Sequence, residues 1–537
     1  MLRPRTAAVA SLLLLPMAAG GFLLQGGPAR TTPRLFDQVL SIVANRYVDS
    51  LQGSAIFEKA ATGLVRELND PYSELLAPKA NEDFNRNVGG RYGGVGMLLE
   101  PQTAGSGTRI TVARVFPHTP AEEGGVLEGD QIVRVDSLPV TGATKIDSVS
   151  NALRGIAGTT VHVTYARPGV PELIKLSFKR AVIHVPAVPY ATIVGDKIGY
   201  IPLQTFNENT AEEVQAAATK LVAQGARGLV LDLRDNGGGI VEQSLAVSSL
   251  FLKDGQSIVN VRGRNSPDEV ARASSEHLSD QLPLVVLTDG NSASASEIVA
   301  GALQDHDRAL VLGTTSFGKG LVQSLFPLEG GYALKITTGK WYTPSGRSIH
   351  RERKLVDGRL VEAKPDSLET EEKKKARPVF KSDAGRTVYG GGGITPDVIV
   401  PDDTISTTEQ DFYRAVAPKA QAFITMLNQY AFELKSSPRT FTVTPAWRAE
   451  LRRRLTAAGV VIDPRHEPVA PKLLDRELDR RVARLVLGDA GAKLRSLDDD
   501  HQLTRAIALL TTARSQNALL AAANTAPISA RTSPQKR

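Results

Sequence analysis

The chain has 537 residues, enough for about three or four domains of ordinary size. It is 42% hydrophobic and 23% charged, as expected of a folded soluble protein, and its lack of cysteine excludes disulfides, thiolate metal sites and a thiol nucleophile. The formal net charge of +7 is modest and aromatic residues make up only 5% of the chain. Because no stripe of basic and aromatic residues occurs, we expect no nucleic-acid partner.

The first 27 residues are typical of an export signal or an N-terminal membrane anchor. Arg3 and Arg5 precede an uncharged stretch, residues 7–24, that includes the run "LLLL". No clean small-x-small cleavage site follows, so both a cleaved signal and a retained anchor stay open. Since no other long uncharged apolar run occurs, we expect the remainder to be soluble and to lie in the periplasm or cell envelope.

Residues 31–88 are predicted to be helical, because apolar residues recur at helical spacing until "NDPYS" (69–73) ends the pattern. From 89 to 184 the pattern becomes rich in strands. A glycine-rich loop, "GGRYGGVGMLL", leads into one strand, and the alternation in "RITVARVF" predicts a half-buried second strand.

This order of elements and the phrase "AEEGGVLEGDQIVRVD" (121–136) resemble a PDZ domain. The resemblance implies that backbone amides of one loop bind a C-terminal carboxylate and that the next strand pairs with an extended peptide. The alternative is a small β-rich spacer whose glycines only make turns. The implied carboxylate-binding residues are Gly93, Gly94, Val95, Gly96 and Met97.

From 185 to 404, predicted strands and helices alternate, which favours βαβ crossovers and a mostly parallel sheet. A polar insertion between 350 and 390 is predicted to be an exposed loop. The segment 405–537 becomes helical again and ends in a tail with the composition of a disordered segment. The expected fold class is therefore α/β and multidomain, with helical regions at both ends and a β-rich insertion.

Three polar clusters follow predicted strands in this region, at the position where open sheets place their sites. They are "LDLRDNGGG" (231–239), "GNSASASEI" (290–298) and "GTTSFGKGLVQ" (313–323). Ser294 and Glu297 match a capping box, so Ser294 alone is explained by a helix start. Lys319 lies between two glycines and can approach the backbone closely, where water is excluded.

Together the clusters resemble the carboxyl-terminal processing peptidases, the tail-specific serine proteases, over about residues 35–400. "WYTPSGRSI" and "GGGITPD" also match that family. The resemblance implies an exported serine endopeptidase that needs no cofactor or metal and acts on proteins with accessible C-termini. It assigns Ser294 as the nucleophile, Lys319 as its base and Gln323 as the residue that orients the lysine.

The family pattern also implies an oxyanion hole made by the Ala295 amide and by Gly238 or Gly239. A serine hydroxyl is a weak nucleophile until a base takes its proton, and lysine is a base only when neutral, which burial favours. Asp305 matches a family acid with a supporting role, although an exposed charge at a helix end would look the same in the sequence.

Several alternatives stay open. His306 could be the base instead. However, a predicted helix of about three turns separates it from Ser294, so the two residues should lie far apart. A non-catalytic peptide-binding protein on the same fold and a hydrolase of small esters are rival functions. The helices after 405 lie outside the resemblance and could bind an adaptor or another partner.

Overall fold

The computed structural model describes residues 32–51, 53–104, 107–167, 170–264, 267–274, 278, 282–351, 353–356, 359–362, 376–403 and 405–525. The predicted export segment and the predicted C-terminal tail lie outside these residues. Among the helices that are described, none has the length and apolar character needed to cross a membrane.

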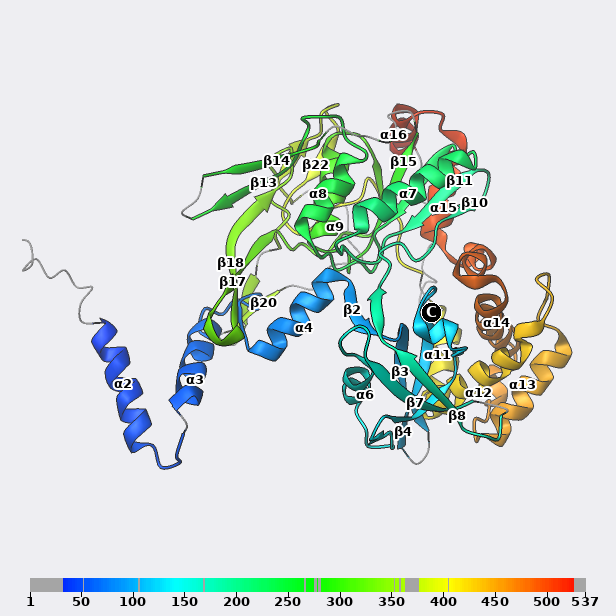
Figure 1. Cartoon of the computed structure of the whole chain (residues 1–537). Helices are drawn as coiled ribbons and strands as arrows, with labels where there is room; N and C mark the ends of the chain where they lie inside the picture. Colours follow the sequence, from blue (N-terminus) through cyan, green and yellow to red (C-terminus); the bar gives the residue numbers. More distant parts are fainter. Residues whose placement is uncertain are drawn as a thin grey trace, which may run out of the picture. The chain divides into compact units, whose positions relative to one another are not determined.

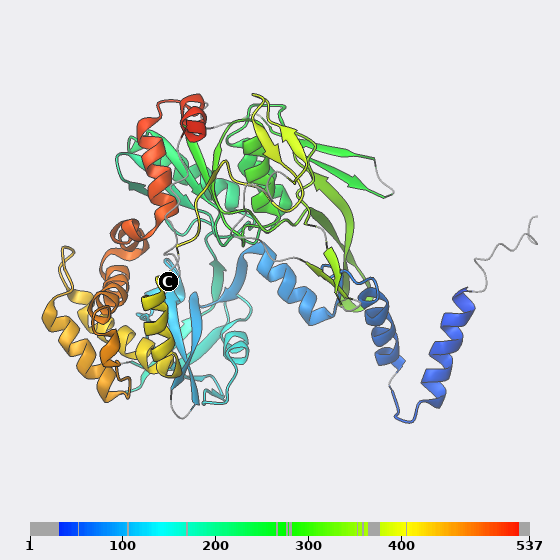
Figure 2. The same ribbon diagram turned by 180° about the vertical axis from the view of Figure 1, so that it is seen from behind.

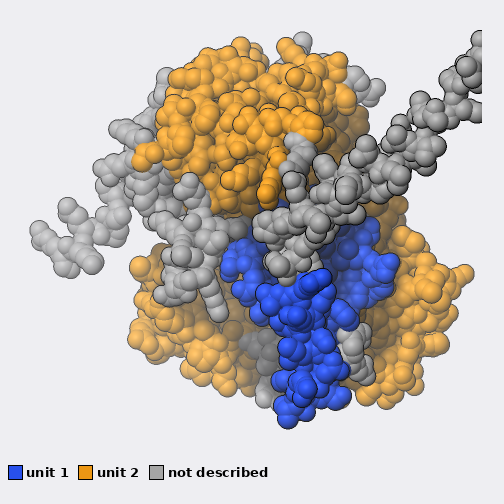
Figure 3. Space-filling model, turned by 90° about the vertical axis from the view of Figure 1, so that its left-hand side faces the viewer, with its two compact units in different colours: residues 1–78, 323–337 blue, residues 79–322, 338–537 orange. Residues whose placement is uncertain are grey.

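The chain divides into two compact units (Figure 3). Unit 1 comprises residues 1–78 and 323–337, and unit 2 comprises residues 79–322 and 338–537. The domain boundaries expected from the sequence stay a prediction.

Unit 1 contains the helices α2 and α3, strand β1 and parts of β17 (Leu321–Pro327) and β18. The helices are α2 (Thr32–Arg46) and α3 (Gly53–Arg66). Strand β1 (Glu74–Leu76) pairs with the first part of β18 (Ala333–Tyr342), with Glu74 opposite Lys335. The turn before β1 is held by Asp70, whose carboxylate accepts hydrogen bonds from the Ser73 hydroxyl (2.6 Å) and the Thr337 hydroxyl (2.5 Å).

In unit 2, the β-rich segment forms an antiparallel sheet in the order β3-β4-β5-β7-β8, with β6 paired to β5. Its core contains the fully buried side chains of Ile110, Ile132, Val161 and Tyr165. A second antiparallel pair, β2 with β9, precedes and follows this sheet in the chain. The helices and strands of the segment are α4 (Pro78–Gly89), β2 (Arg91–Gly94), β3 (Met97–Ala104), β4 (Gly107–Val115), α5 (Pro120–Glu123), β5 (Gln131–Val135), β6 (Leu138–Pro139), α6 (Ile146–Leu153), β7 (Thr160–Ala166), β8 (Ile174–Lys179) and β9 (Ala181–His184).

A six-stranded sheet in the order β10-β11-β12-β15-β16-β23 lies at the centre of unit 2. β10 is antiparallel to β11, and the remaining neighbours pair in parallel. The strands are β10 (Thr192–Val194), β11 (Ile198–Pro202), β12 (Gly228–Asp232), β15 (Leu284–Thr288), β16 (Leu310–Gly313) and β23 (Val398–Ile399).

Helices cover both faces of this sheet (Figures 1 and 2). Leu229 and Leu231 of β12 pack in one cluster with α7 (Thr210–Ala223), α8 (Val241–Ser249) and α9 (Ala295–Asp305). Val230, which points to the opposite face, packs with Leu503, Ala506 and Leu510 of α15 (His501–Thr512). Burial on both faces explains why these strands are continuous apolar runs rather than alternating ones.

The expectation of a mostly parallel sheet is not supported for the region as a whole. Strands β13 (Ser257–Gly263), β14 (Glu269–Arg272), β17 (Leu321–Pro327) and β18 belong to a second sheet whose described registers are antiparallel. The segment predicted as one exposed loop contains two antiparallel pairs. These are β19 (Arg353–Val356) with β20 (Arg359–Glu362), and β21 (Val379–Lys381) with β22 (Thr387–Tyr389). Antiparallel hairpins need no crossover helix, so alternation of strands and helices could not reveal them.

The segment after 405 is helical and has a core of its own before it reaches the central sheet. Phe412, Leu427, Leu451 and Leu474 are buried in that core. An adaptor-binding role for these helices has no support in the structure, in which α15 instead packs on the central sheet. The helices are α11 (Thr407–Val416), α12 (Ala420–Glu433), α13 (Pro445–Ala457), α14 (Ala470–Arg495), α15 and α16 (Gln516–Thr525).

We expect Leu503→Ala to lower the free energy of unfolding by about 2–5 kcal/mol, because it leaves a cavity between α15 and the sheet. Urea unfolding followed by circular dichroism measures this change. Thr511→Ala, at an exposed position on the same helix, is the control and should change stability by less than about 0.5 kcal/mol. Equal stability of both variants and the wild type would contradict packing of α15 on the sheet.

Candidate active site

The three polar clusters follow neighbouring strands of the central sheet. β12 ends at Asp232, β15 at Thr288 and β16 at Gly313, and these strands are adjacent and parallel. Parallel strands bring their carboxyl ends to one edge, so the turns that follow converge there.

Ser294 occupies a strained position immediately before α9. Its φ of +57° and ψ of −111° lie outside the regions that side-chain-bearing residues usually adopt. The side chain is half-buried, whereas Ala295, the first residue of α9, is fully buried. Helical hydrogen bonding leaves the amides of a first turn unused, so the Ala295 amide is a donor beside the Ser294 side chain.

The two neighbouring serines of the run have structural roles. The Ser292 hydroxyl is buried and donates to the Leu233 carbonyl (2.8 Å). The Ser296 hydroxyl, also buried, donates to the Asn236 carbonyl (2.8 Å). Both hydroxyls therefore connect the start of α9 to residues 233–239, the segment after β12 that is here called the glycine turn. Of the three serines in the run, Ser294 is the one that is not buried.

Gly238 lies in direct contact with the backbone around Ser294. Its φ is +96°, and a Cβ added there would lie 2.7 Å from the Ala293 carbonyl oxygen and 3.0 Å from Ser294 Cβ. Only glycine allows this approach. The Gly238 amide, however, donates to Asn236 Oδ1 (2.9 Å), so in this conformation it already has an acceptor.

Asn236 is a residue that sequence reasoning missed. Its side chain is fully buried, and its amide nitrogen donates to the Leu203 carbonyl (2.7 Å). Its backbone carbonyl accepts from the Ala293 amide (3.0 Å). The signal available in the sequence was its place directly before three glycines, but its partners are distant in the chain.

Glu297 joins the turn that carries Ser294 to the turn that carries Lys319, here called the lysine turn. One carboxylate oxygen accepts hydrogen bonds from the backbone amides of Ser294 (2.9 Å) and Lys319 (2.9 Å). The other accepts from the Ser316 hydroxyl (2.6 Å) and the Gly318 amide (2.6 Å). The interpretation of Glu297 as half of a capping box is confirmed by its bond to Ser294, but it is incomplete.

The Glu297 carboxyl is fully buried, which raises its pKa above the ordinary value, while its hydrogen bonds act in the opposite direction. The donors around it are three amides and one hydroxyl. Such a set fits a carboxylate, because each donor finds an acceptor only while the group is ionised.

The backbone on both sides of Lys319 is tightly packed. Gly318 has a φ of +94°, and a Cβ on Gly320 would lie 2.9 Å from His350 Cβ. The Lys319 carbonyl accepts from the indole N–H of Trp341 (3.0 Å), whose side chain is buried. The lysine side chain is half-buried. Close backbone approach around Lys319, as the flanking glycines suggested, is therefore present.

Asp305 lies at the other end of α9, a helix of 11 residues, so about 16 Å separates it from the helix start. It is buried rather than exposed. Its carboxylate lies 2.7 Å from a guanidinium nitrogen of Arg347, which is also buried, and accepts from the Ser345 amide (2.9 Å). This ion pair supports the turn in "TPSGRS", so Asp305 acts on the fold around the site and not at Ser294.

His306 follows Asp305 and is likewise remote from Ser294, as expected. Its two ring nitrogens lie 2.7 Å from the Asp383 carboxylate and 2.7 Å from the Ser257 carbonyl. Gln323 belongs to unit 1, where its amide nitrogen donates to the Thr337 hydroxyl (3.4 Å). Its role toward Lys319 stays a prediction.

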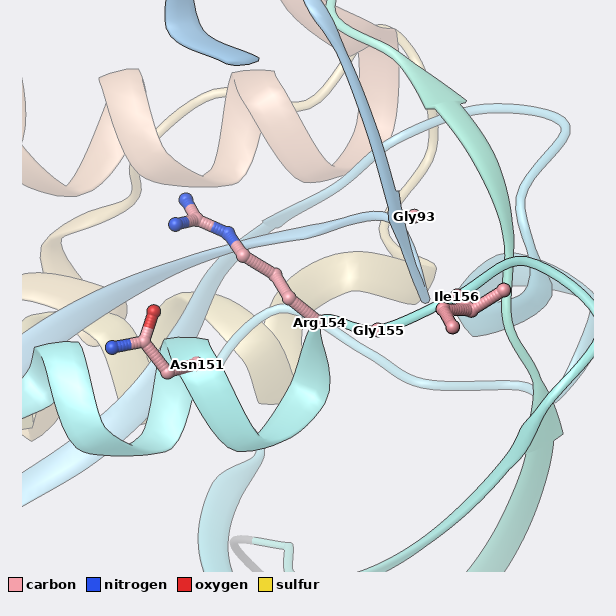
Figure 4. Close-up of a pocket in the computed structure, with 5 residues that line it drawn as sticks. All are labelled: Gly93, Asn151, Arg154, Gly155 and Ile156. Carbon is pink, nitrogen blue, oxygen red and sulfur yellow. The ribbon is translucent and has the colours of Figure 1, made fainter. Parts of the chain in front are cut away.

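The predicted peptide groove of the β-rich segment contains a cavity of about 230 Å³. Gly94, Val95, Gly96 and Met97 line it, together with side chains of α6. Gly93 and Gly94 pair with β9, so the loop itself is shorter than the sequence suggested. Gly93 lines a neighbouring cavity of about 360 Å³ (Figure 4).

Arg154 is a second residue that the sequence did not single out. It follows α6 directly and lines both cavities, and Figure 4 shows it projecting from the end of that helix near Asn151. Its guanidinium carbon lies 5.4 Å from the centre of the Tyr92 ring. A positive charge therefore borders the groove.

Comparison with known proteins agrees with this geometry. Residues 197–358 match the model of peptidase family S41, and residues 111–167 match that of the PDZ domain. The carboxy-terminal-processing protease of Bartonella bacilliformis is 39% identical over 319 residues, which is 58% of this chain and 71% of that protein. The carboxy-terminal processing protease CtpA of Bacillus subtilis is 33% identical over 350 residues, which is 65% of this chain and 73% of that protein.

A solved structure, the photosystem II D1 C-terminal processing protease, is 31% identical and covers 62% of this chain and 85% of its own, with a TM-score of 0.36. The S41 match covers the turns that carry Ser294 and Lys319. The alignments with the two relatives cover more than two thirds of the length of each relative. The chain therefore belongs to the carboxy-terminal processing proteases of peptidase family S41, with a PDZ domain.

Proposed function

We propose that the protein is an exported serine endopeptidase in which Ser294 is the nucleophile and Lys319 is its base. The observation that carries this proposal is the Glu297 carboxylate, which binds the backbone amides of both residues. Two turns that are 25 positions apart in the chain are thereby held on one buried group. Export rests on the sequence pattern of residues 1–27.

In each half of the reaction, one proton moves to Lys319 and then away from it. The neutral Lys319 amine takes the proton of the Ser294 hydroxyl as its oxygen attacks the peptide carbonyl. The resulting ammonium gives that proton to the leaving amine as the peptide C–N bond breaks. Lys319 then takes a proton from the water that attacks the acyl-enzyme, and it returns this proton to the Ser294 oxygen as the ester bond breaks. Gln323, four positions after Lys319, is the residue that we assign to orient the lysine.

The developing oxyanion needs backbone donors that already point at it. Ala295 supplies the first, because its amide is at the start of α9. The second comes from the glycine turn. Gly238 supplies it if substrate replaces the Asn236 side chain as acceptor of its amide hydrogen, and otherwise Gly239 does.

The PDZ domain supplies substrate recognition in this proposal. In this proposal the backbone amides of Val95 to Met97, which line the groove, bind a negative charge such as a C-terminal carboxylate. Arg154 adds a positive charge on the same groove. β3, the end strand of its sheet, then pairs with an extended peptide tail.

The rival function is a non-catalytic peptide-binding protein on the same fold. We do not favour it, because the serine, the lysine and the carboxylate that joins their turns are all present. A reactive organophosphate probe distinguishes the two functions, since only an activated serine is labelled.

We expect Ser294→Ala and Lys319→Arg to abolish peptide hydrolysis, while His306→Ala keeps most of it. A guanidinium stays charged and accepts no proton, so arginine cannot replace the base. Hydrolysis of a casein digest by the purified variants measures this. The rate should rise with pH as the base loses its proton, and a plateau that begins below about pH 5 would contradict a lysine base.

Gly238→Ala should lower kcat by about 100-fold or more, because the added methyl group would push the glycine turn away from Ser294 and misplace the oxyanion donor. Gly237→Ala is the matched control, since no atom lies within 4 Å of a Cβ at that position. Both variants are assayed on one peptide. Equal activity of the two would show that the turn does not contact the reacting centre.

Capping a substrate's C-terminal carboxylate as an amide should reduce cleavage of long substrates partially, because the amide cap removes the charge but leaves pairing with β3 intact. Rates for free and amidated versions of one peptide measure the effect. Arg154→Gln should reduce the difference between them. Equal cleavage of both peptides by the wild type would mean that the PDZ domain does not read the carboxylate.

A further inference from the structure

Arg234 links the glycine turn to a part of the chain that the peptidase family match does not cover. It lies two residues before Asn236 and four before Gly238. Its guanidinium donates two hydrogen bonds to the carboxylate of Asp500, each 2.9 Å long, across 266 positions of sequence. A bidentate pair of this kind fixes both distance and orientation.

Asp500 is itself held from the C-terminal helices. It is the N-cap of α15, where its carboxylate accepts from the Leu503 amide (2.9 Å). The Lys493 ammonium, near the end of α14, donates to it at 2.6 Å. Burial opposes ionisation of Asp500, but the hydrogen bonds and charges of Arg234 and Lys493 outweigh it and lower the pKa of the carboxyl.

The other side of the guanidinium faces Asp232, the last residue of β12, at 2.9 and 2.6 Å. Asp232 in turn accepts from the Tyr200 hydroxyl (2.8 Å). The Gln502 side-chain oxygen accepts a further hydrogen bond from Arg234 (3.1 Å). A largely buried network with no net formal charge thus adjoins the glycine turn. It consists of the carboxylates of Asp232 and Asp500 and the cationic side chains of Arg234 and Lys493.

The two carboxylates have different mechanical roles. Asp232 is the last residue of β12, so it holds the Arg234 side chain from within the same strand and its turn. Asp500 belongs to a separate element, and α15 anchors it to the sheet through Leu503 and Leu510. The glycine turn also contains Asp235 at a φ of +57°, a conformation that needs support from its surroundings.

We propose that Asp500 is a positioning residue that, through Arg234, holds the glycine turn where its amide meets the developing oxyanion. This inference rests on the proposed function. It assigns a role in the reaction to the helices after 405, although Asp500 contacts no reacting atom.

The test is Asp500→Asn, assayed for kcat and KM on a peptide substrate. We expect kcat to fall by about 10- to 100-fold, because a displaced donor acts only on the transition state. KM should change by less than about 2-fold for the same reason. Leu451→Ala is the control for loss of stability, since it leaves a cavity in the separate core of the C-terminal helices and keeps both α15 and the Asp500 side chain. At a temperature where it is folded, its kcat should equal that of the wild type.

A second arm tests whether Arg234 carries the effect. In an Arg234→Gln background, Asp500→Asn should cause no further loss, whereas independent roles would give additive losses. If Asp500→Asn does not fold, Asp500→Glu replaces it, with a smaller fall in kcat at constant KM expected.

The inference is overturned if wild-type kcat survives in the Asp500 variant, if Leu451→Ala loses as much, or if the losses add. An inactive wild type would instead contradict the proposed function itself.

Discussion

The buried carboxylate of Glu297 is the constraint on which the candidate active site depends. A charge removed from water is costly unless its hydrogen-bonding capacity is satisfied, and here four donors surround it. Because those donors belong to the turns around Ser294 and Lys319, neither turn can move without leaving the carboxylate short of a partner. The cost of burying one charge therefore keeps the two turns together.

A second set of contacts shapes the site around that carboxylate. The glycine turn approaches Ser294 so closely that a methyl group at Gly238 would contact it. The buried hydroxyls of Ser292 and Ser296 hold the same turn from the helix side. The strained backbone at Ser294 is thus supported on both sides by buried hydrogen bonds, which lets this turn persist in an uncommon conformation.

The C-terminal helices complete the burial of the central sheet. Without α15, the apolar side chains on one face of β12, β15 and β16 would be exposed to water, because parallel strands of this kind are apolar on both faces. The same helix brings Asp500 to Arg234, and an ion pair between Arg114 and Asp489 (3.2 Å) joins α14 to a PDZ strand. The segment from 489 to 500 therefore contacts both the PDZ domain and the base of the glycine turn.

The sequence by itself determined the residue types of the site and the local structure that carries them. Strand ends, glycine turns and the helix start at Ser294 are local features, set by backbone preference and by apolar spacing over a few residues. The tertiary structure alone decided the partners of the buried groups. That Glu297 binds the turn around Lys319, that the Asn236 side chain donates to the Leu203 carbonyl and that Arg234 pairs with Asp500 depend on packing between distant segments. The antiparallel sheet beside the parallel one was missed for the same reason: strand pairing is a long-range contact that no local pattern specifies.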